Sequence, residues 1–360
     1  MRHLRIGLIF LSACAADTSA VGAPAQGNTN GVQPDAASQD ASGQIPEQTL
    51  TDAPTAQTPS APTDTQMLAD PATAVPAPSA DANAPRPSAG CGQTLPAGVN
   101  SLSLEFGGET RTHDIYVPAS YDADTPVPLL LNLHPLTLGG LLHGIWTSES
   151  GLNPKAEAEG FVLAQPDGTG LPASWNAGQD CCAPASTNAV DDVGYIAALV
   201  EEIQDSLCID TRRVYATGMS NGAYLSHRIA CEYPGRLAAI APVVGSLSTE
   251  LGCADGRAIP VLQLSGSEDS LASREESVAH WVSANGCDGS TEQSYQQGAV
   301  TCTTHRNCDE GVEVTHCVVD GGGHCFYSDA PTQFTPGCGP RDDIVSQELI
   351  WEFLSRWRLP

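Results

Sequence analysis

Between Cys91 and Pro360, short apolar runs alternate with longer stretches of helical periodicity, and this alternation restricts the fold more than any other feature. Several runs are apolar throughout, as strands buried on both faces of a sheet are. We expect strands at 111–118, 128–134, 161–165, 213–217, 238–244, 259–265 and 312–319. Helices are expected over 192–207, 221–232, 272–284 and 342–357. This order predicts an α/β fold with a mostly parallel, doubly wound sheet, whose active site lies at the carboxyl ends of the strands.

The run Gly218-Met219-Ser220-Asn221-Gly222 lies between a predicted strand and a predicted helix. A nucleophile elbow needs a serine at such a sharp corner, so that its hydroxyl projects over the sheet, and flanking glycines let neighbouring backbone pass without a Cβ clash. The pattern alone arises by chance, but this context favours a nucleophile over an ordinary turn serine. We therefore predict Ser220 as a catalytic nucleophile.

Two later strands supply an acid and a base in the chain order that this type of site requires. The strand at 259–265 is followed by a turn with two acids, and we predict Asp269 as the triad acid, with Glu268 as the alternative. The strand at 312–319 leads into a triple-glycine loop that ends at His324, which we predict as the base. Acyl transfer by such a triad needs no cofactor, and none is expected.

The loop after the strand at 128–134 is expected to complete an oxyanion hole. Pro135 has no N–H to donate, so we predict the N–H groups of Asn221 and Leu136 as the two donors, with Thr137 as the alternative to Leu136. His134 either lies at the substrate cleft and braces this loop, or is an ordinary strand-end histidine.

Trp175 follows another strand at the same predicted edge. We expect it to line the substrate cleft, where an indole could stack on a sugar or a phenolic acid. The alternative is a packing role beside Cys181 and Cys182.

Twelve cysteines follow residue 90, and in a chain that is exported an even number of cysteines would imply up to six disulfides. The candidates are Cys91, Cys181, Cys182, Cys208, Cys231, Cys253, Cys287, Cys302, Cys308, Cys317, Cys325 and Cys338. Short loops favour pairs between Cys308 and Cys317 and between Cys325 and Cys338, whereas Cys181 and Cys182 are expected to pair with two distant partners. Histidines lie among the later cysteines, but the spacings fit no zinc motif, so we expect no metal.

Residues 1–14 have the order of a bacterial export signal, with Arg2 and Arg5 before an apolar run too short to span a bilayer. The run ends in Leu-Ser-Ala-Cys, which resembles a lipobox and predicts lipidation of Cys14. The protein would then be a cell-envelope lipoprotein that meets the membrane only through this anchor. The alternative is an ordinary cleaved signal and secretion.

Residues 15–90 contain no Phe, Trp or Tyr and repeat Ala, Pro, Thr, Ser, Asp and Gln. Such a segment cannot bury enough surface to offset chain entropy, so we expect a disordered tether before one catalytic domain over 91–360, acting as a monomer. From Cys91 onward, 34 acidic residues face 12 basic ones, a net charge of −22. This surface repels polyanions and argues against nucleic acid as a partner, but it is compatible with a neutral ester, small or polymeric.

Residues 91–360 resemble the polyhydroxybutyrate depolymerase and feruloyl esterase-like family of secreted α/β-hydrolases. The resemblance is carried by residues 213–222, 165–168, 174–178, 190–194 and 321–324. It implies an α/β-hydrolase fold with Ser220, Asp269 and His324 as the triad. The implied activity is ester hydrolysis, on a polyester of the polyhydroxybutyrate type or on a polysaccharide-linked ester, with a feruloyl or acetyl-xylan esterase as the alternative.

Three departures from the family pattern lie near the cleft. Pro135 replaces a glycine after His134, Ser265 replaces a frequent histidine, and Cys325-Phe326 replaces the Thr-Trp that commonly follows the catalytic histidine. The resemblance therefore does not identify the substrate. A surface binding protein without turnover and a peptidase are the rival interpretations.

Overall fold

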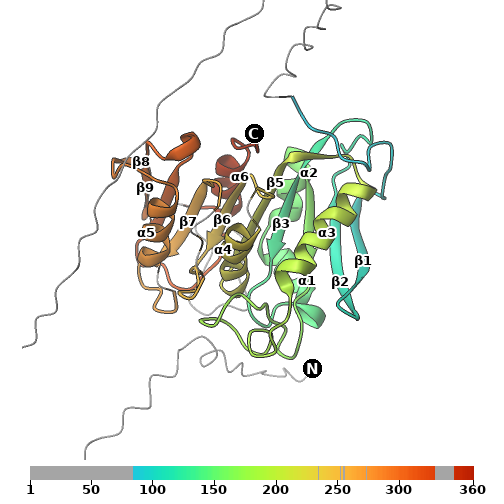
Figure 1. Ribbon diagram of the computed structural model, residues 1–360, viewed down its shortest axis with the longest axis horizontal. Helices are drawn as coiled ribbons and strands as arrows, with labels where there is room; N and C mark the ends of the chain where they lie inside the picture. Colours follow the sequence, from blue (N-terminus) through green and yellow to red (C-terminus); the bar gives the residue numbers. More distant parts are fainter. Residues whose placement is uncertain (1–83, 234, 252, 254–255, 273, 329–343) are drawn as a thin grey trace, which may run out of the picture. The chain divides into compact units, whose positions relative to one another are not determined.

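The computed structural model describes residues 84–233, 235–251, 253, 256–272, 274–328 and 344–360 (Figure 1). The predicted signal, Cys14 and almost all of the predicted tether lie outside these residues, as does Cys338. No helix within the described ranges is long and apolar enough to cross a bilayer.

The described strands form one sheet, in the order β1-β2-β4-β3-β5-β6-β7-β10-β9-β8. Its strands are β1 (Gly98–Phe106), β2 (Glu109–Val117), β3 (Val127–Leu133), β4 (Val162–Pro166), β5 (Ile209–Met219), β6 (Ala239–Val243), β7 (Val261–Gly266), β8 (Thr291–Gln297), β9 (Val300–His305) and β10 (Val314–Val319). The six central strands, β4-β3-β5-β6-β7-β10 in sheet order, run parallel to one another. The strands β1 and β2 at one edge and β9 and β8 at the other are antiparallel to their neighbours. The mostly parallel α/β sheet predicted from the sequence is confirmed.

Helices cover both faces of this sheet and create two cores. The helices are α1 (His143–Glu149), α2 (Leu152–Glu159), α3 (Asp192–Ser206), α4 (Asn221–Glu232), α5 (Arg274–Ala284) and α6 (Ser346–Leu354). Helices α3, α4 and α5 cover one face of the sheet, and α1, α2 and α6 cover the other (Figure 1). Side chains of the first three helices build one core, and those of the other three build the second. Alternate residues of β3 point into each, with Leu129 and Leu131 in the first and Leu130 in the second, as the two-residue repeat of a strand requires.

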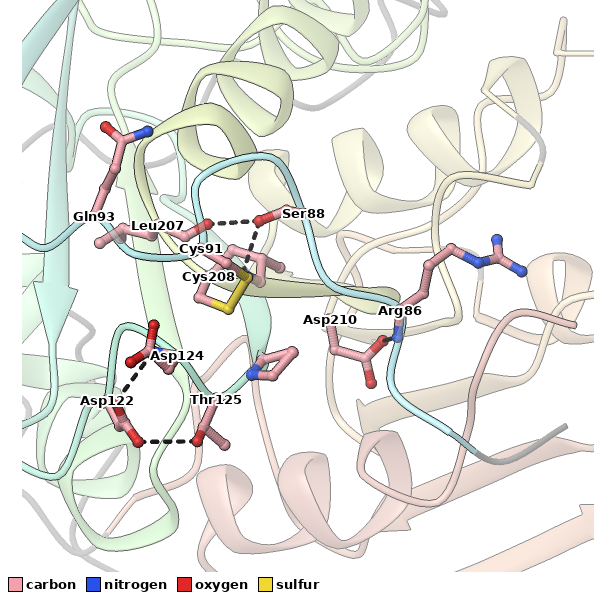
Figure 2. The surroundings of a disulfide bond; sticks show 12 residues. Arg86, Ser88, Cys91, Gln93, Asp122, Asp124, Thr125, Leu207, Cys208 and Asp210 are labelled. Carbon is pink, nitrogen blue, oxygen red and sulfur yellow. Dashed lines mark hydrogen bonds between the residues drawn. A yellow bond between two sulfur atoms is a disulfide. The ribbon is translucent and has the colours of Figure 1, made fainter. Parts of the chain in front are cut away.

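The folded domain begins before Cys91, where the sequence placed its start. Arg86 N–H donates to Asp210 Oδ1 at 2.9 Å, and Ser88 Oγ donates to the carbonyl oxygen of Leu207 at 2.6 Å (Figure 2). Cys91 then forms a disulfide with Cys208. Residues from Arg86 therefore belong to the domain, and the predicted boundary is corrected. The attachment uses backbone and polar groups, which give no hydrophobic signal in the sequence.

Five disulfides are formed between described cysteines, namely Cys91–Cys208, Cys181–Cys182, Cys231–Cys253, Cys287–Cys308 and Cys302–Cys317. Cys302 and Cys317 face each other across the antiparallel pair β9 and β10. This register explains why the predicted bond between Cys308 and Cys317 is wrong, and Cys308 instead reaches Cys287. Among the described residues no group of His, Cys, Asp and Glu could hold a metal ion.

Cys181 and Cys182 bond to each other, which corrects the expectation of two distant partners. The other described cysteines are all bonded elsewhere, and this leaves the two neighbours for each other. Cys325 is also disulfide-bonded, but its predicted partner lies outside the described residues.

Candidate active site

Ser220 lies at the corner between β5 and α4. Its backbone has φ 53° and ψ −119°, a strained conformation for a residue other than glycine and one that clusters at functional sites. Its N–H donates to the carbonyl oxygen of Val243 at the end of β6, at 3.0 Å. A Cβ added at Gly218 or Gly222 would stand 2.6 or 2.0 Å from the carbonyl oxygen of Leu133. The corner therefore requires both glycines, as a nucleophile elbow does.

Asp269 and His324 follow the neighbouring parallel strands β7 and β10 and meet beyond the ends of these strands. His324 Nδ1 lies 3.0 Å from Asp269 Oδ2, and Leu271 N–H donates to Asp269 Oδ1 at 2.9 Å. The Asp269 side chain is 2% exposed and the imidazole is 22% exposed. The carboxylate is thus withdrawn from solvent while the ring stays accessible. Glu268, the alternative acid, is exposed, and its backbone N–H binds Gly322 O at 2.8 Å.

Arg274 supports the acid loop and was missed by the sequence analysis. Its guanidinium Nη1 donates to the carbonyl oxygens of Gly266 and Asp269, at 2.8 and 3.1 Å. On the neighbouring loop, Tyr327 Oη donates to Gly323 O at 2.7 Å. These bonds fix the loop backbone on either side of the Asp269–His324 contact. An arginine at the start of an amphipathic helix gives no sequence signal for this role.

The elbow belongs to the same edge as the acid and base loops. Strands β5, β6, β7 and β10 are consecutive in the sheet, and the candidate residues follow the carboxyl ends of three of them. Val244 N–H donates to Leu264 O at 2.8 Å and Ser267 N–H to Val319 O at 3.0 Å, so the strand ends are linked from β6 to β10. Active sites of parallel sheets form at this edge.

In the loop after β3, the sequence offers the N–H groups of Leu136 and Thr137 as alternative oxyanion donors, and one of the two is free. Thr137 N–H donates to Ala173 O at 2.9 Å, so it is occupied and the alternative to Leu136 is wrong. Leu136 N–H has no acceptor among the described residues. Asn221 is the first residue of α4, and such a residue has no acceptor for its N–H within its own helix. Both donors predicted for the oxyanion hole thus remain available.

His134 and Trp175 are both fully buried, so neither lines a substrate cleft and that expectation is corrected. Gly168 N–H donates to His134 Nε2 at 2.8 Å, and His134 Nδ1 lies 2.8 Å from Pro135 O. Burial lowers the pKa of His134 to about 4, which leaves a neutral ring with its proton on Nδ1. The indole Nε1–H of Trp175 donates to His134 O at 3.0 Å. Both side chains therefore contact the backbone of the loop after β3 from the protein interior.

A parallel sheet with a serine elbow, and with an Asp–His pair at the same edge, is the arrangement of an α/β-hydrolase. The chain is a carboxylic ester hydrolase of this fold. It is 29% identical over 267 residues to feruloyl esterase B from Piromyces equi, which covers 68% of this chain and 44% of that protein. It is also 29% identical over 289 residues to feruloyl esterase D from Neurospora crassa, which covers 75% of this chain and 91% of that protein.

Other similarities are more distant. A bifunctional acetylxylan esterase/xylanase from Neocallimastix patriciarum is 24% identical over 268 residues, covering 72% of this chain and 35% of that protein. The chain therefore spans less than half of this relative and of the one from Piromyces equi. Among solved structures, an acetyl xylan esterase from Aspergillus awamori is similar with a TM-score of 0.49 and 17% identity, covering 62% of this chain and 94% of that one. No family model matches the chain.

Proposed function

We propose that this protein is a serine esterase that releases hydroxycinnamic acids, of which ferulic acid is one, from polysaccharide-linked esters. The observation that carries the proposal is the Asp269–His324 contact of 3.0 Å at the sheet edge that also bears the Ser220 elbow. The acyl group is proposed from the relatives that are named feruloyl esterases, one of which is matched over 91% of its length.

The proposed mechanism assigns one task to each residue. His324 Nδ1 faces Asp269, so Nε2 is the nitrogen that would accept the proton of Ser220 Oγ. The hydroxyl oxygen attacks the ester carbonyl, and the N–H groups of Asn221 and Leu136 stabilise the oxyanion. His324 returns the proton to the departing sugar alcohol, and water then hydrolyses the acyl-enzyme by the same steps. Asp269 holds the ring in the required tautomer and stabilises its cationic form.

Export is part of the proposal. Disulfides form and persist in oxidising compartments, and five of them lie within the described residues. Lipidation at Cys14 and a tether up to the folded domain would hold the enzyme at a cell surface facing an insoluble substrate. Both remain predictions from the sequence.

An acetyl-xylan esterase is the second candidate, favoured by the relative that combines an acetylxylan esterase with a xylanase. The polyhydroxybutyrate interpretation depends on the sequence resemblance alone. We therefore prefer a hydroxycinnamoyl ester as substrate to a polyester.

The test uses the purified full chain with methyl ferulate, acetylated xylan and polyhydroxybutyrate, each compared with a Ser220→Ala variant. We expect turnover of methyl ferulate, reduced by about 10⁴- to 10⁶-fold in the variant. Preferential release of acetate would support the second candidate. If no ester is turned over while an organophosphonate still labels Ser220, the choice of substrate is wrong. Absence of labelling would favour the binding protein without turnover.

A further inference from the structure

A cluster of charged side chains contacts the end of the loop at 134–143, which we call the oxyanion loop, and lies outside the proposed triad. His143 at the start of α1 places Nδ1 2.7 Å from Asp167 Oδ1 and Nε2 3.4 Å from Asp114 Oδ2. The first contact is a short hydrogen-bonded ion pair, and the second is an ion pair too long for a good hydrogen bond. The His143 side chain is only 10% exposed. Solvent therefore screens the first pair weakly.

Asp167 connects three segments through one carboxylate. Oδ1 accepts the backbone N–H of Gly140 at 2.9 Å in addition to His143 Nδ1. Oδ2 accepts Thr112 Oγ1 from β2 at 2.8 Å. The end of the oxyanion loop is thereby fixed to the turn that follows β4 and to the neighbouring strand.

The same turn also holds the beginning and the middle of the loop. Gly168 N–H binds the His134 ring at 2.8 Å, and Ala173 O accepts Thr137 N–H at 2.9 Å. Thr137 has φ 76°, which is strained for a threonine and persists only where surrounding contacts enforce it. Leu136, between these anchors, keeps its N–H free. The turn at 167–173 thus holds the loop at 134–143 at its beginning, middle and end.

We propose that the ion pair between His143 and Asp167 is a positioning element that keeps Leu136 N–H in place for the oxyanion. Neither residue touches the reacting atoms, so both act through the loop backbone. The inference rests on the proposed function, because it assumes that Leu136 is an oxyanion donor. Preorganised donors lose their value when the loop that carries them can move.

The charge of His143 follows from its surroundings. Burial alone would lower the pKa of its ring, but Asp114 and Asp167 outweigh burial and raise that pKa to about 9. Two other histidines face the cluster, and burial lowers the pKa of both His113 and His134. Arg111 Nη2 also lies close, bound to Asp167 O at 3.0 Å.

Because the pKa of His143 is raised on folding, the contribution of the charged pair is complete below the ordinary histidine pKa of about 6.5 and is lost as pH rises through about 9. The loop should therefore loosen in mildly alkaline solution. The other histidines of the cluster are already neutral near pH 7 and do not change charge in that window.

The experiment compares His143→Gln with His280→Gln in the full chain, using methyl ferulate. His280 lies on α5 and has no role in the site, so it provides a matched control for the same exchange. For His143→Gln we expect kcat to fall about 10- to 100-fold, somewhat less than loss of a donor itself, while KM changes little. In the wild-type enzyme kcat should fall as pH rises through about 9, and this fall should be absent from the His143→Gln variant. His280→Gln should keep both the wild-type kcat and its fall near pH 9.

A second pair of variants separates positioning from loss of fold. Asp167→Asn should also lower kcat. The double variant that combines it with His143→Gln should have a kcat no lower than that of the more impaired single variant, because the two residues act as a unit. Thermal unfolding and labelling of Ser220 by an organophosphonate identify a variant that has not folded. The proposal is overturned if a folded His143→Gln enzyme keeps its full kcat, or if the losses of kcat add up in the double variant. A rise of KM as large as the fall in kcat would also overturn it. A wild-type chain that hydrolyses no ester would instead refute the proposed function.

Discussion

The indole of Trp175 and the backbone of His134 are joined by a hydrogen bond of 3.0 Å from Nε1–H to the carbonyl oxygen. The backbone of the same tryptophan pairs with the side-chain amide of Asn221, through bonds of 2.7 and 3.0 Å. One buried residue therefore connects the two segments that are expected to supply the oxyanion donors. These bonds fix the spacing of the two segments, and a fully buried ring cannot stack on a substrate.

Replacing Trp175 with Phe should keep most of the packing but leave the buried His134 carbonyl without its indole donor. We expect a loss of about 1–3 kcal/mol in the free energy of unfolding, and a fall in kcat that is the same on methyl ferulate and on feruloylated polysaccharide. Thermal unfolding and steady-state kinetics on both substrates measure these effects.

Trp281→Phe is the matched control, because it removes a similar buried bond, from the indole to His227 Nδ1 at 2.9 Å, on α5. This control should lose stability and keep kcat. A loss confined to the polymer in the Trp175 variant would restore the cleft-wall role that burial argues against.

The choice of acid can be tested by two exchanges at adjacent positions. Asp269→Asn should lower kcat by about 10⁴-fold, because the amide would favour the wrong tautomer of His324. Glu268→Gln changes an exposed side chain beside it and should leave kcat unchanged. Both are measured on methyl ferulate with thermal unfolding as the check of fold. The reverse result would make Glu268 the acid despite the observed contact of His324 with Asp269.

The central strands could be predicted because burial on both faces makes them apolar throughout. β3, β6 and β7 lie within two residues of their expected ranges, whereas β5 extends beyond the expected 213–217 at both ends. The two outermost strands, β1 and β8, could not be predicted, since β8 exposes nearly every side chain and β1 buries none of its side chains fully. In the short helix α2 only two residues are buried, too few for a periodic signal. For the strands and helices, the sequence reveals mainly what burial imposes on composition.

The candidate site shows the same division. The placement of Ser220, Asp269 and His324 at one edge of the sheet could be predicted because each follows a strand, in a known chain order, within a glycine-rich or acidic turn. The support from Arg274 and the ion pair of His143 with Asp167 could not, because these contacts join residues from different loops. Disulfide pairing failed for that reason as well, since register across β9 and β10 decides it.

The disulfides should differ in what they contribute to stability. Cys91–Cys208 spans 117 residues and Cys302–Cys317 spans 15. In the chain-entropy model, replacing both cysteines by serine should cost about 5 kcal/mol for the long loop and about 3 kcal/mol for the short one. Denaturant unfolding of the two double variants measures the difference. Equal losses would mean that native packing, and not loop length, determines the contribution.

The start of the folded domain can be located by limited proteolysis of the intact chain. The sequence predicts a tether without a core, whereas Arg86, Ser88 and Cys91 are bound to β5 and to the residues just before it (Figure 2). A protease of broad specificity should therefore remove the tether and stop at or before Arg86, and mass spectrometry of the remaining core identifies its first residue. A core that begins after Cys91 would restore the boundary inferred from the sequence. In the variant that lacks Cys91 and Cys208, we expect cleavage to advance past Ser88, because only weak backbone and hydroxyl bonds would then hold this segment.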